Sequence, residues 1–255
     1  TKLFYSGKDE FPNTTLDDPF LSALADGGFQ VGELAKCYYP DGTDITSLDY
    51  EEAEQQTLAL LKQENVVIFE PAIRFNNLFI RVDVLVKTGN ELQLIEVKAK
   101  SYSHKKDGEF LNKSGKIDSK WKPYIFDVAF QQFVLKNAIP NSIIISYLML
   151  VDKQTECATH GLNQKFLLTR DESHRRGVCV SNSLTQNDLA HKLLRKINVG
   201  KAINIAYETE LTQGMPEHTF KRNIIALAEY YQRDEKIAPF IGKKCKTCEF
   251  KCSIE

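Results

Sequence analysis

The strongest constraint in this sequence is a series of three strand-length segments that follow one another with only short turns between them. Val66–Phe75, Leu78–Lys87 and Glu91–Lys100 are rich in β-branched and aliphatic residues, which is typical of strands. Asn76-Asn77 and Gly89-Asn90 separate them, and these residue types tolerate the positive φ of tight hairpin turns. The sequence therefore predicts an antiparallel meander.

A helix and a further strand follow the meander, and together they predict an α/β fold. Pro123–Ala138 has apolar residues at helical spacing. Ile143–Val151 is apolar throughout, as are strands that are buried on both faces. An acidic first turn predicts another helix before the meander, from Ser47 or Asp49 to about Gln63. A mixed central sheet flanked by helices satisfies this order of elements.

The outer segments have weaker patterns. We expect an irregular segment over residues 1–45, short strands at Lys165–Thr169 and Gly177–Ser181, and amphipathic helices at Leu184–Ile197 and Thr219–Arg233. These expectations divide the chain into four parts, which are an N-terminal segment over 1–45, a core over 46–151, a mixed or helical completion of the domain over 152–240, and a Cys-rich tail over 241–255.

Charged residues inside two of the apolar strands carry the clearest chemical signal. Asp83 lies in one strand, and Glu96 and Lys98 lie in the next. Because side chains alternate between the faces of a strand, Glu96 and Lys98 point to the same side, and a hairpin can bring Asp83 beside them. Two carboxylates and an amine are what a Mg²⁺-dependent phosphodiesterase needs. Salt-bridged charges on solvated strand faces are the alternative interpretation.

Composition and missing motifs narrow the function classes. The formal net charge is −1, so a nucleic-acid partner requires a local concentration of positive charge. The sequence contains no phosphate-binding Gly-x-x-x-x-Gly-Lys-Ser/Thr loop, no dinucleotide-binding Gly-x-Gly-x-x-Gly after a strand and no His-Glu-x-x-His. No apolar stretch reaches about 18 residues, so we expect neither a transmembrane helix nor a membrane partner. The first residues lack the layout of a signal peptide, and we expect a cytoplasmic protein.

The spacing of the charged residues resembles a known nuclease signature. Asp83, twelve intervening residues and then Glu96-Val97-Lys98 are similar to the motif of the PD-(D/E)XK nuclease superfamily. The wider stretch resembles its RecB-like branch, which includes CRISPR-associated nucleases with an iron–sulfur cluster. It looks closer still to an uncharacterised bacterial family that carries this domain ahead of a further C-terminal domain. The similar phrases are Val31-Gly32-Glu33-Leu34-Ala35, Arg81-Val82-Asp83-Val84-Leu85, Ile95-Glu96-Val97-Lys98 and Asp127-Val128-Ala129-Phe130-Gln131.

The resemblance implies a restriction-endonuclease-like fold and a metal-dependent nuclease that acts in repair, recombination or defence. It implies that Asp83 and Glu96 bind Mg²⁺ or Mn²⁺ with the Val97 carbonyl as a third ligand, and that Lys98 is the catalytic lysine. Nucleic acid is the expected partner, with DNA ahead of RNA, and a further C-terminal domain or partner protein is also implied. A catalytically inactive module that binds nucleic acid or serves as a scaffold, and an RNA-directed nuclease, remain the alternatives.

Three further positions follow from the same resemblance. Gln131 matches the glutamine of the branch's Gln-x-x-x-Tyr signature, although Leu135 stands where the tyrosine is expected. The branch often has a metal-binding histidine on its first helix. Residues 43–63 contain no histidine, and we expect Glu54 or Glu51 from this helix, or Glu70 from the first strand, as substitutes. Asp127 either stabilises the start of its helix or holds Lys98 or a water at the metal.

Residues 98–122 combine positive charge with aromatic rings directly after Lys98. Lysines neutralise phosphates, and aromatic side chains can stack on unpaired bases, so we expect nucleic acid to lie along this segment. A solvated loop is the alternative. The residues assigned to this contact are Lys100, Lys105, Lys106, Lys113, Lys116 and Trp121, with Tyr102 and Phe110 as further aromatic residues.

Three of the six cysteines gather near the C-terminus. Cys245, Cys248 and Cys252 include a Cys-x-x-Cys pair, which offers two thiolates to one metal from one tight turn. Zinc and a [4Fe–4S] cluster usually need four ligands, and this run supplies three. The resemblance implies a [4Fe–4S] cluster completed by a cysteine near the N-terminus. The resemblance implies that the family's own cysteine comes just before Thr1, so Cys37 is the last choice for it, and that the family's last ligand comes after Glu255. A Zn²⁺ site and a flexible tail with incidental cysteines are the alternatives.

Overall fold

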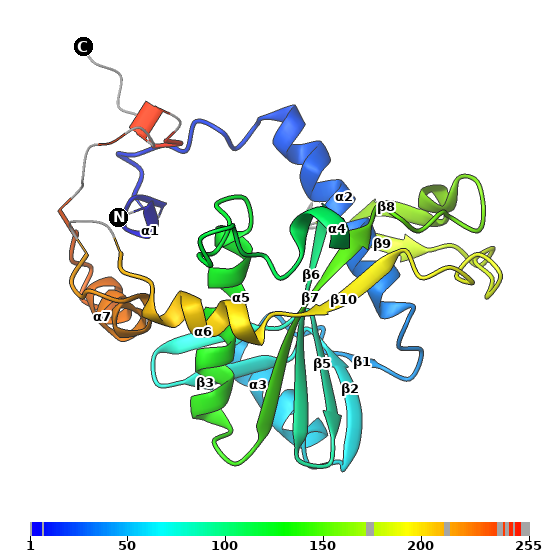
Figure 1. The fold of residues 1–255 in the computed structure, drawn as a ribbon, viewed down its shortest axis with the longest axis horizontal. Coiled ribbons are helices and arrows are strands. Elements are labelled where there is room, and N and C mark those ends of the chain that lie inside the picture. Colours follow the sequence, from blue (N-terminus) through cyan, green and yellow to red (C-terminus); the bar gives the residue numbers. More distant parts are fainter. Residues whose placement is uncertain are drawn as a thin grey trace. The chain divides into compact units, whose positions relative to one another are not determined.

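The structure is a computed structural model, drawn in Figure 1. It describes residues 2–6, 8–171, 176–211, 215–238, 242, 245–246 and 248–250. The chain divides into two compact units. Unit 1 consists of Thr1–Leu24 and Ala206–Glu255, and unit 2 consists of Ala25–Ile205. All of the predicted catalytic residues belong to unit 2.

Unit 2 is built on a mixed sheet. In the part of the chain that the structure describes, this sheet has six strands in the order β1-β2-β5-β6-β7-β10. The pairs β1–β2 and β6–β7 are parallel, and the other neighbours are antiparallel. Its strands are β1 (Thr43–Asp44), β2 (Asn65–Phe69), β5 (Val84–Thr88), β6 (Glu91–Tyr102), β7 (Ile143–Asp152) and β10 (Leu194–Asn198).

Helices flank the sheet, and three of them are α2 (Pro19–Lys36), α3 (Tyr50–Leu60) and α5 (Lys122–Ala138). Because side chains of β6 alternate, Ile95 and Val97 face one side of the sheet, and Glu96 and Lys98 face the other. Leu34 of α2 shares a buried cluster with Ile95. On the opposite side α3 packs on β2 and α5 packs on β7 (Figure 1). The predicted α/β class, a mixed central sheet flanked by helices, is confirmed.

The first two predicted strands are each interrupted, and the two interruptions lie opposite each other. The first divides into β2 and β3 (Ala72–Phe75), and the second into β4 (Leu78–Arg81) and β5. β3 and β4 form a separate two-stranded sheet. Pro71 cannot donate to a strand ladder, and Glu70 adopts a φ of 54°, so the chain bends here. The Glu70 N–H donates to the Asp83 carbonyl at 3.2 Å and ties the two bends together. The prediction of unbroken strands was wrong, and Pro71 was its warning signal.

Two predictions for the outer segments were also wrong. Residues 1–45 contain the 18-residue helix α2, which forms despite the low helix propensity of Gly27-Gly28 and buries Leu34 and Ala35 near its C-terminal end. The helix expected over Leu184–Ile197 is replaced by turns and by β10, which pairs with β7. Asp188 closes one of these turns by accepting hydrogen bonds from the Thr185 N–H and hydroxyl at 2.7 and 2.8 Å.

The remaining elements are α1 (Lys2–Ser6), α4 (His104–Asp107), a 3-10 helix η1 (Leu162–Lys165), β8 (Phe166–Arg170), β9 (Arg176–Val180), α6 (Gly200–Glu208) and α7 (Phe220–Gln232). β8 and β9 pair antiparallel at the two predicted short strands, and α7 matches the last predicted helix. Across the described ranges, every helix is too short or too polar to cross a membrane.

Candidate active site

Asp83 and Glu96 meet where β5 begins and the β3–β4 hairpin bends away. The antiparallel register of β5 and β6 includes Val84 opposite Ile95, and the next position in that register sets Asp83 opposite Glu96. The Asp83 Oδ2 atom accepts a hydrogen bond from the Val97 N–H at 2.6 Å. The carboxylate thus binds an amide of β6 just beyond the last pair of the ladder. The predicted alignment of Asp83 with the Glu96 strand follows directly from this register.

Lys98, Glu96, Asp127 and Gln131 form a closed ring of polar contacts. The Lys98 Nζ atom lies 2.5 Å from Glu96 Oε1 and 3.0 Å from Asp127 Oδ2. The Gln131 Nε2 atom donates to Glu96 Oε2 at 2.7 Å and to Asp127 Oδ1 at 3.3 Å. Each carboxylate is therefore held by both the ammonium and the amide. β6 supplies one half of the ring, and α5 supplies the other.

The side-chain oxygen of Gln131 is buried and has no hydrogen-bond partner in the described part of the chain. Turning the amide over would aim this acceptor at two carboxylates, so the partners fix its orientation. A buried polar atom without a partner costs about 1–3 kcal/mol. The site thus presents an acceptor that a water or another donor would satisfy.

Burial raises the pKa of both central carboxyl groups. It raises the pKa of Asp83 to about 6, and repulsion from Glu70 adds to this. Burial and then the Asp83 carboxylate raise the pKa of Glu96 to about 8, and the charge and hydrogen bond of Lys98 oppose this shift. Burial disfavours the Lys98 ammonium, but Glu96 and then Asp127 outweigh it, and the net pKa of Lys98 lies above its ordinary value. Lys98 is therefore a cation at neutral pH.

Glu70 is the expected histidine substitute that lies near these carboxyl groups. Glu70 contacts Asp83 through the backbone hydrogen bond across the bend, and burial raises the pKa of its carboxyl group although Arg81 opposes this. Glu54 instead forms an ion pair with Arg74 of β3 at 2.9 Å. This ion pair gives Glu54 a partner outside the Asp83–Glu96 cluster, and it leaves Glu70 as the candidate that lies beside Asp83.

The structure decides between the two interpretations of Asp127. α5 begins at Lys122, and its first turn contains no acidic residue. Stabilisation of the helix start is therefore wrong for Asp127, which instead contacts Lys98.

Lys36, which no sequence pattern indicated, also lies near the carboxyl groups. It belongs to the part of α2 in unit 2, and its Nζ atom pairs with Asp44 at 2.6 Å and with Glu33 at 2.8 Å. Its charge lowers the pKa of Glu70. Lys36 was missed because the helix that carries Lys36 and Glu33 was not predicted. The one signal that could have drawn attention to this helix was the phrase Val31–Ala35, which contains Glu33.

The lysine-rich segment folds around its own aromatic rings. Tyr102, Phe110 and Trp121 are only 1%, 0% and 1% exposed. Trp121 is therefore a core residue in this structure, and its assignment as a stacking surface for bases is corrected. The Lys100 Nζ atom lies over the rings of Trp121 and Tyr124, 5.1 and 4.8 Å from their centroids. Six lysines of the segment are exposed, and they include four that were assigned to nucleic-acid contact, namely Lys105, Lys106, Lys113 and Lys116.

The cysteine tail is described in part. Cys252 lies outside the described residues. The Cys248 N–H donates to the Cys245 carbonyl at 3.4 Å, and the Gly242 N–H donates to Cys245 Sγ at 3.4 Å. Cys37 belongs to unit 2, where burial raises the pKa of its thiol and disfavours the thiolate that a metal would bind.

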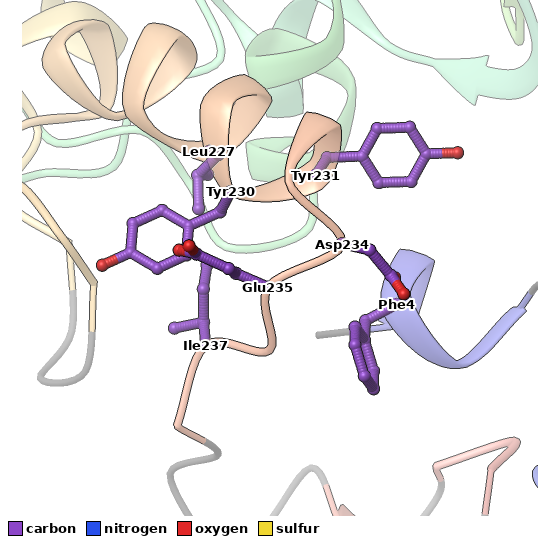
Figure 2. Close-up of a pocket in the computed structure, with 7 residues that line it drawn as sticks. All are labelled: Phe4, Leu227, Tyr230, Tyr231, Asp234, Glu235 and Ile237. Atoms are coloured by element: carbon purple, nitrogen blue, oxygen red, sulfur yellow. The ribbon is translucent and has the colours of Figure 1, made fainter.

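Unit 1 contains a small pocket of about 120 Å³, which is less than the roughly 300 Å³ of the smallest usual ligand pockets. Figure 2 shows its lining residues. Two of its lining residues already contact a cation of the chain. Lys8 Nζ pairs with Asp234 at 2.7 Å and lies 4.3 Å from the Phe4 ring centroid. The lining residues are Phe4, Leu227, Tyr230, Tyr231, Asp234, Glu235 and Ile237.

No model of a known protein family matches the chain, and a search of curated proteins finds no similar sequence. Function is therefore inferred from the residues of the site.

The metal-free protein should lose stability as the pH rises from about 4 to about 8. Below the ordinary pKa of a carboxyl group, about 4, both states hold these protons. Above it the unfolded chain releases them, whereas Asp83 and Glu96 retain theirs up to about 6 and about 8. The folded state binds more protons in this window, so its advantage is lost as the pH rises.

Urea unfolding in EDTA across this pH range measures the effect. Glu96→Gln should remove on the order of 5 kcal/mol of the pH dependence. Glu51→Gln, which changes an exposed carboxyl group, is the control. The same pH dependence in Glu96→Gln and in the wild type would contradict the assignment.

Proposed function

We propose that this chain is a metal-dependent nuclease of the PD-(D/E)XK type with a restriction-endonuclease-like core, and that it hydrolyses phosphodiester bonds in nucleic acid, DNA rather than RNA. The observation that carries the proposal is the ring in which Glu96, Lys98 and Gln131 meet beside Asp83. Burying carboxyl groups together is costly. Clusters of strongly shifted pKa values are typical of functional sites.

The donor atoms at this spot suit a hard divalent cation. In the described residues, no group of three or more histidine, cysteine, aspartate or glutamate side chains is arranged to hold a metal. The oxygens of Asp83, Glu96 and the Val97 carbonyl are nevertheless the ligand type that Mg²⁺ and Mn²⁺ prefer, and Glu70 lies beside Asp83 as a further donor. A bound ion would supply charge stabilisation at the scissile phosphate and a nucleophile generated from water.

The other residues have roles that follow from their charge and contacts. Lys98 has a raised pKa, so it acts as a cation that donates hydrogen bonds to developing negative charge and not as a proton acceptor. Gln131 holds Glu96 through its nitrogen, and its buried oxygen can accept a hydrogen bond from a water and orient it. These two roles account for the presence of both the Lys98 ammonium and the Gln131 amide beside the Glu96 carboxylate.

The Cys-rich tail is proposed as a separate metal site. Its turn at Cys245 and Cys248 supplies two of the four ligands of a [4Fe–4S] cluster, or of Zn²⁺, and Cys252 is proposed as a third. No step of the nuclease reaction depends on this site.

The protein should cleave labelled DNA with Mg²⁺ or Mn²⁺ and should be inert in EDTA. Asp83→Asn, Glu96→Gln and Lys98→Met should each reduce the rate by about 10²–10³-fold, because each removes charge from the reacting centre. Glu54→Gln is the matched control: it makes the same carboxyl-to-amide change at the residue that pairs with Arg74, and cleavage should persist.

Single- and double-stranded DNA and RNA of one sequence serve as substrates in this assay. Cleavage that survives in all three site variants would move the active centre elsewhere. A folded wild type that is inert on every substrate with Mn²⁺ would instead support a catalytically silent nucleic-acid-binding module. Cleavage of RNA alone would make the protein an RNA-directed nuclease.

Nucleic acid should bind along the exposed lysines that follow β6. We expect the double reversals Lys105→Glu/Lys106→Glu and Lys113→Glu/Lys116→Glu to weaken binding. They should also reduce the dependence of log K on log salt by about 0.7–0.9 for each phosphate that a lysine no longer neutralises. Fluorescence anisotropy of a labelled oligonucleotide in EDTA, over a range of salt concentrations, measures both effects.

The control for this experiment is Lys62→Glu/Lys136→Glu. Lys62 lies in the turn before β2, whereas Glu70 follows that strand, and Lys136 lies in the last turn of α5, more than two turns after Asp127. If the affinity and salt slope of the reversal variants equal those of this control variant, the segment is a solvated loop.

A further inference from the structure

The contacts of Lys98 point to a role for Asp127 that its position on the helix does not explain. Lys98 Nζ has two carboxylate partners, Glu96 Oε1 at 2.5 Å and Asp127 Oδ2 at 3.0 Å. The side chain of Glu96 is 6% exposed, whereas that of Asp127 is 40% exposed. The lysine therefore bridges an interior carboxylate and one at the solvent edge.

A divalent cation bound by Glu96 competes with the lysine for the same negative charge. Lys98 binds Glu96 Oε1, and Gln131 binds Glu96 Oε2, but each oxygen keeps a further lone pair for a cation, so charge decides which partner the cation displaces. Gln131 is a neutral amide, and it is buried. Lys98 carries a charge of the same sign as the incoming cation and is repelled by it. Lys98 is thus the partner that leaves Glu96.

We propose that Asp127 is a positioning residue, which retains the Lys98 ammonium at the site when Glu96 exchanges that ion pair for a divalent cation. The inference rests on the proposed function, because it presupposes that Glu96 binds a cation. Asp127 is suited to this role because it is already 3.0 Å from the ammonium. Gln131 also holds it through the 3.3 Å hydrogen bond to Oδ1, so a shift of Lys98 toward it needs little rearrangement.

The proposal predicts how Asp127 affects cation affinity. In Asp127→Asn the ammonium loses its second anionic partner and competes more strongly for Glu96. The Mn²⁺ dissociation constant should therefore rise by about 10-fold, as it does when partners of metal ligands are removed. In a Lys98→Met background the competing ammonium is absent, and adding Asp127→Asn should change the dissociation constant by less than about 2-fold.

Calorimetric titration of the full chain with Mn²⁺ alone, for the wild type, the two single variants and the double variant, tests this cycle without any cleavage assay. Circular dichroism establishes that each variant is folded. Asp127→Glu, which keeps a carboxylate, provides a second test and should restore most of the wild-type affinity.

The outcomes separate this inference from the proposed function. An equal loss of affinity in both backgrounds would make Asp127 a direct ligand or a simple charge effect, and no loss in either would remove it from the site. Both results overturn the positioning role while leaving the cation site intact. A folded wild type that does not bind Mn²⁺ would overturn the cation site and the inference together.

Discussion

The pairing of Asp83 with Glu96 inside an apolar sheet is the constraint on which unit 2 depends. Burial raises the pKa of both groups, so their ionised forms require compensation. The Val97 N–H binds one carboxylate, and Lys98 and Gln131 bind the other. These contacts account for the order of elements, because a strand pair supplies the carboxylates and the following helix supplies the amide that holds one of them.

The bend at Glu70-Pro71 gives this cluster its place. If the first two predicted strands had continued unbroken, cross-strand partners would surround Asp83 on a closed sheet. Instead β3 and β4 leave as a separate hairpin, and α5 packs on that hairpin and on β7. The Gln131 side chain can then reach Glu96, and the Asp127 side chain can reach Lys98. Lys98 and Gln131 already bind the two oxygens of Glu96, so a divalent cation at Glu96 would share this carboxylate with an ammonium that it repels.

Local rules predicted the strand half of the site. Alternation along β6 puts Glu96 and Lys98 on one face, and the tight turn at Gly89, where φ is 55°, fixes the register that brings Asp83 opposite Glu96. The helix half depends on how α5 rotates and packs, which spacing does not encode, so the Asp127 contact stayed one of two interpretations. Trp121 was misassigned because a loop that buries its own aromatic rings has the same composition as a nucleic-acid-binding loop.

Crystals soaked in Mn²⁺ and measured for anomalous scattering would test the central claim most directly, because the anomalous signal locates the ion without reference to activity. The account predicts a peak bonded to the carboxylates of Asp83 and Glu96, with Lys98 released from Glu96 and still paired with Asp127. A crystal in which Mn²⁺ occupies other positions, while Lys98 keeps its contact with Glu96 and no peak lies between the two carboxylates, would contradict the account.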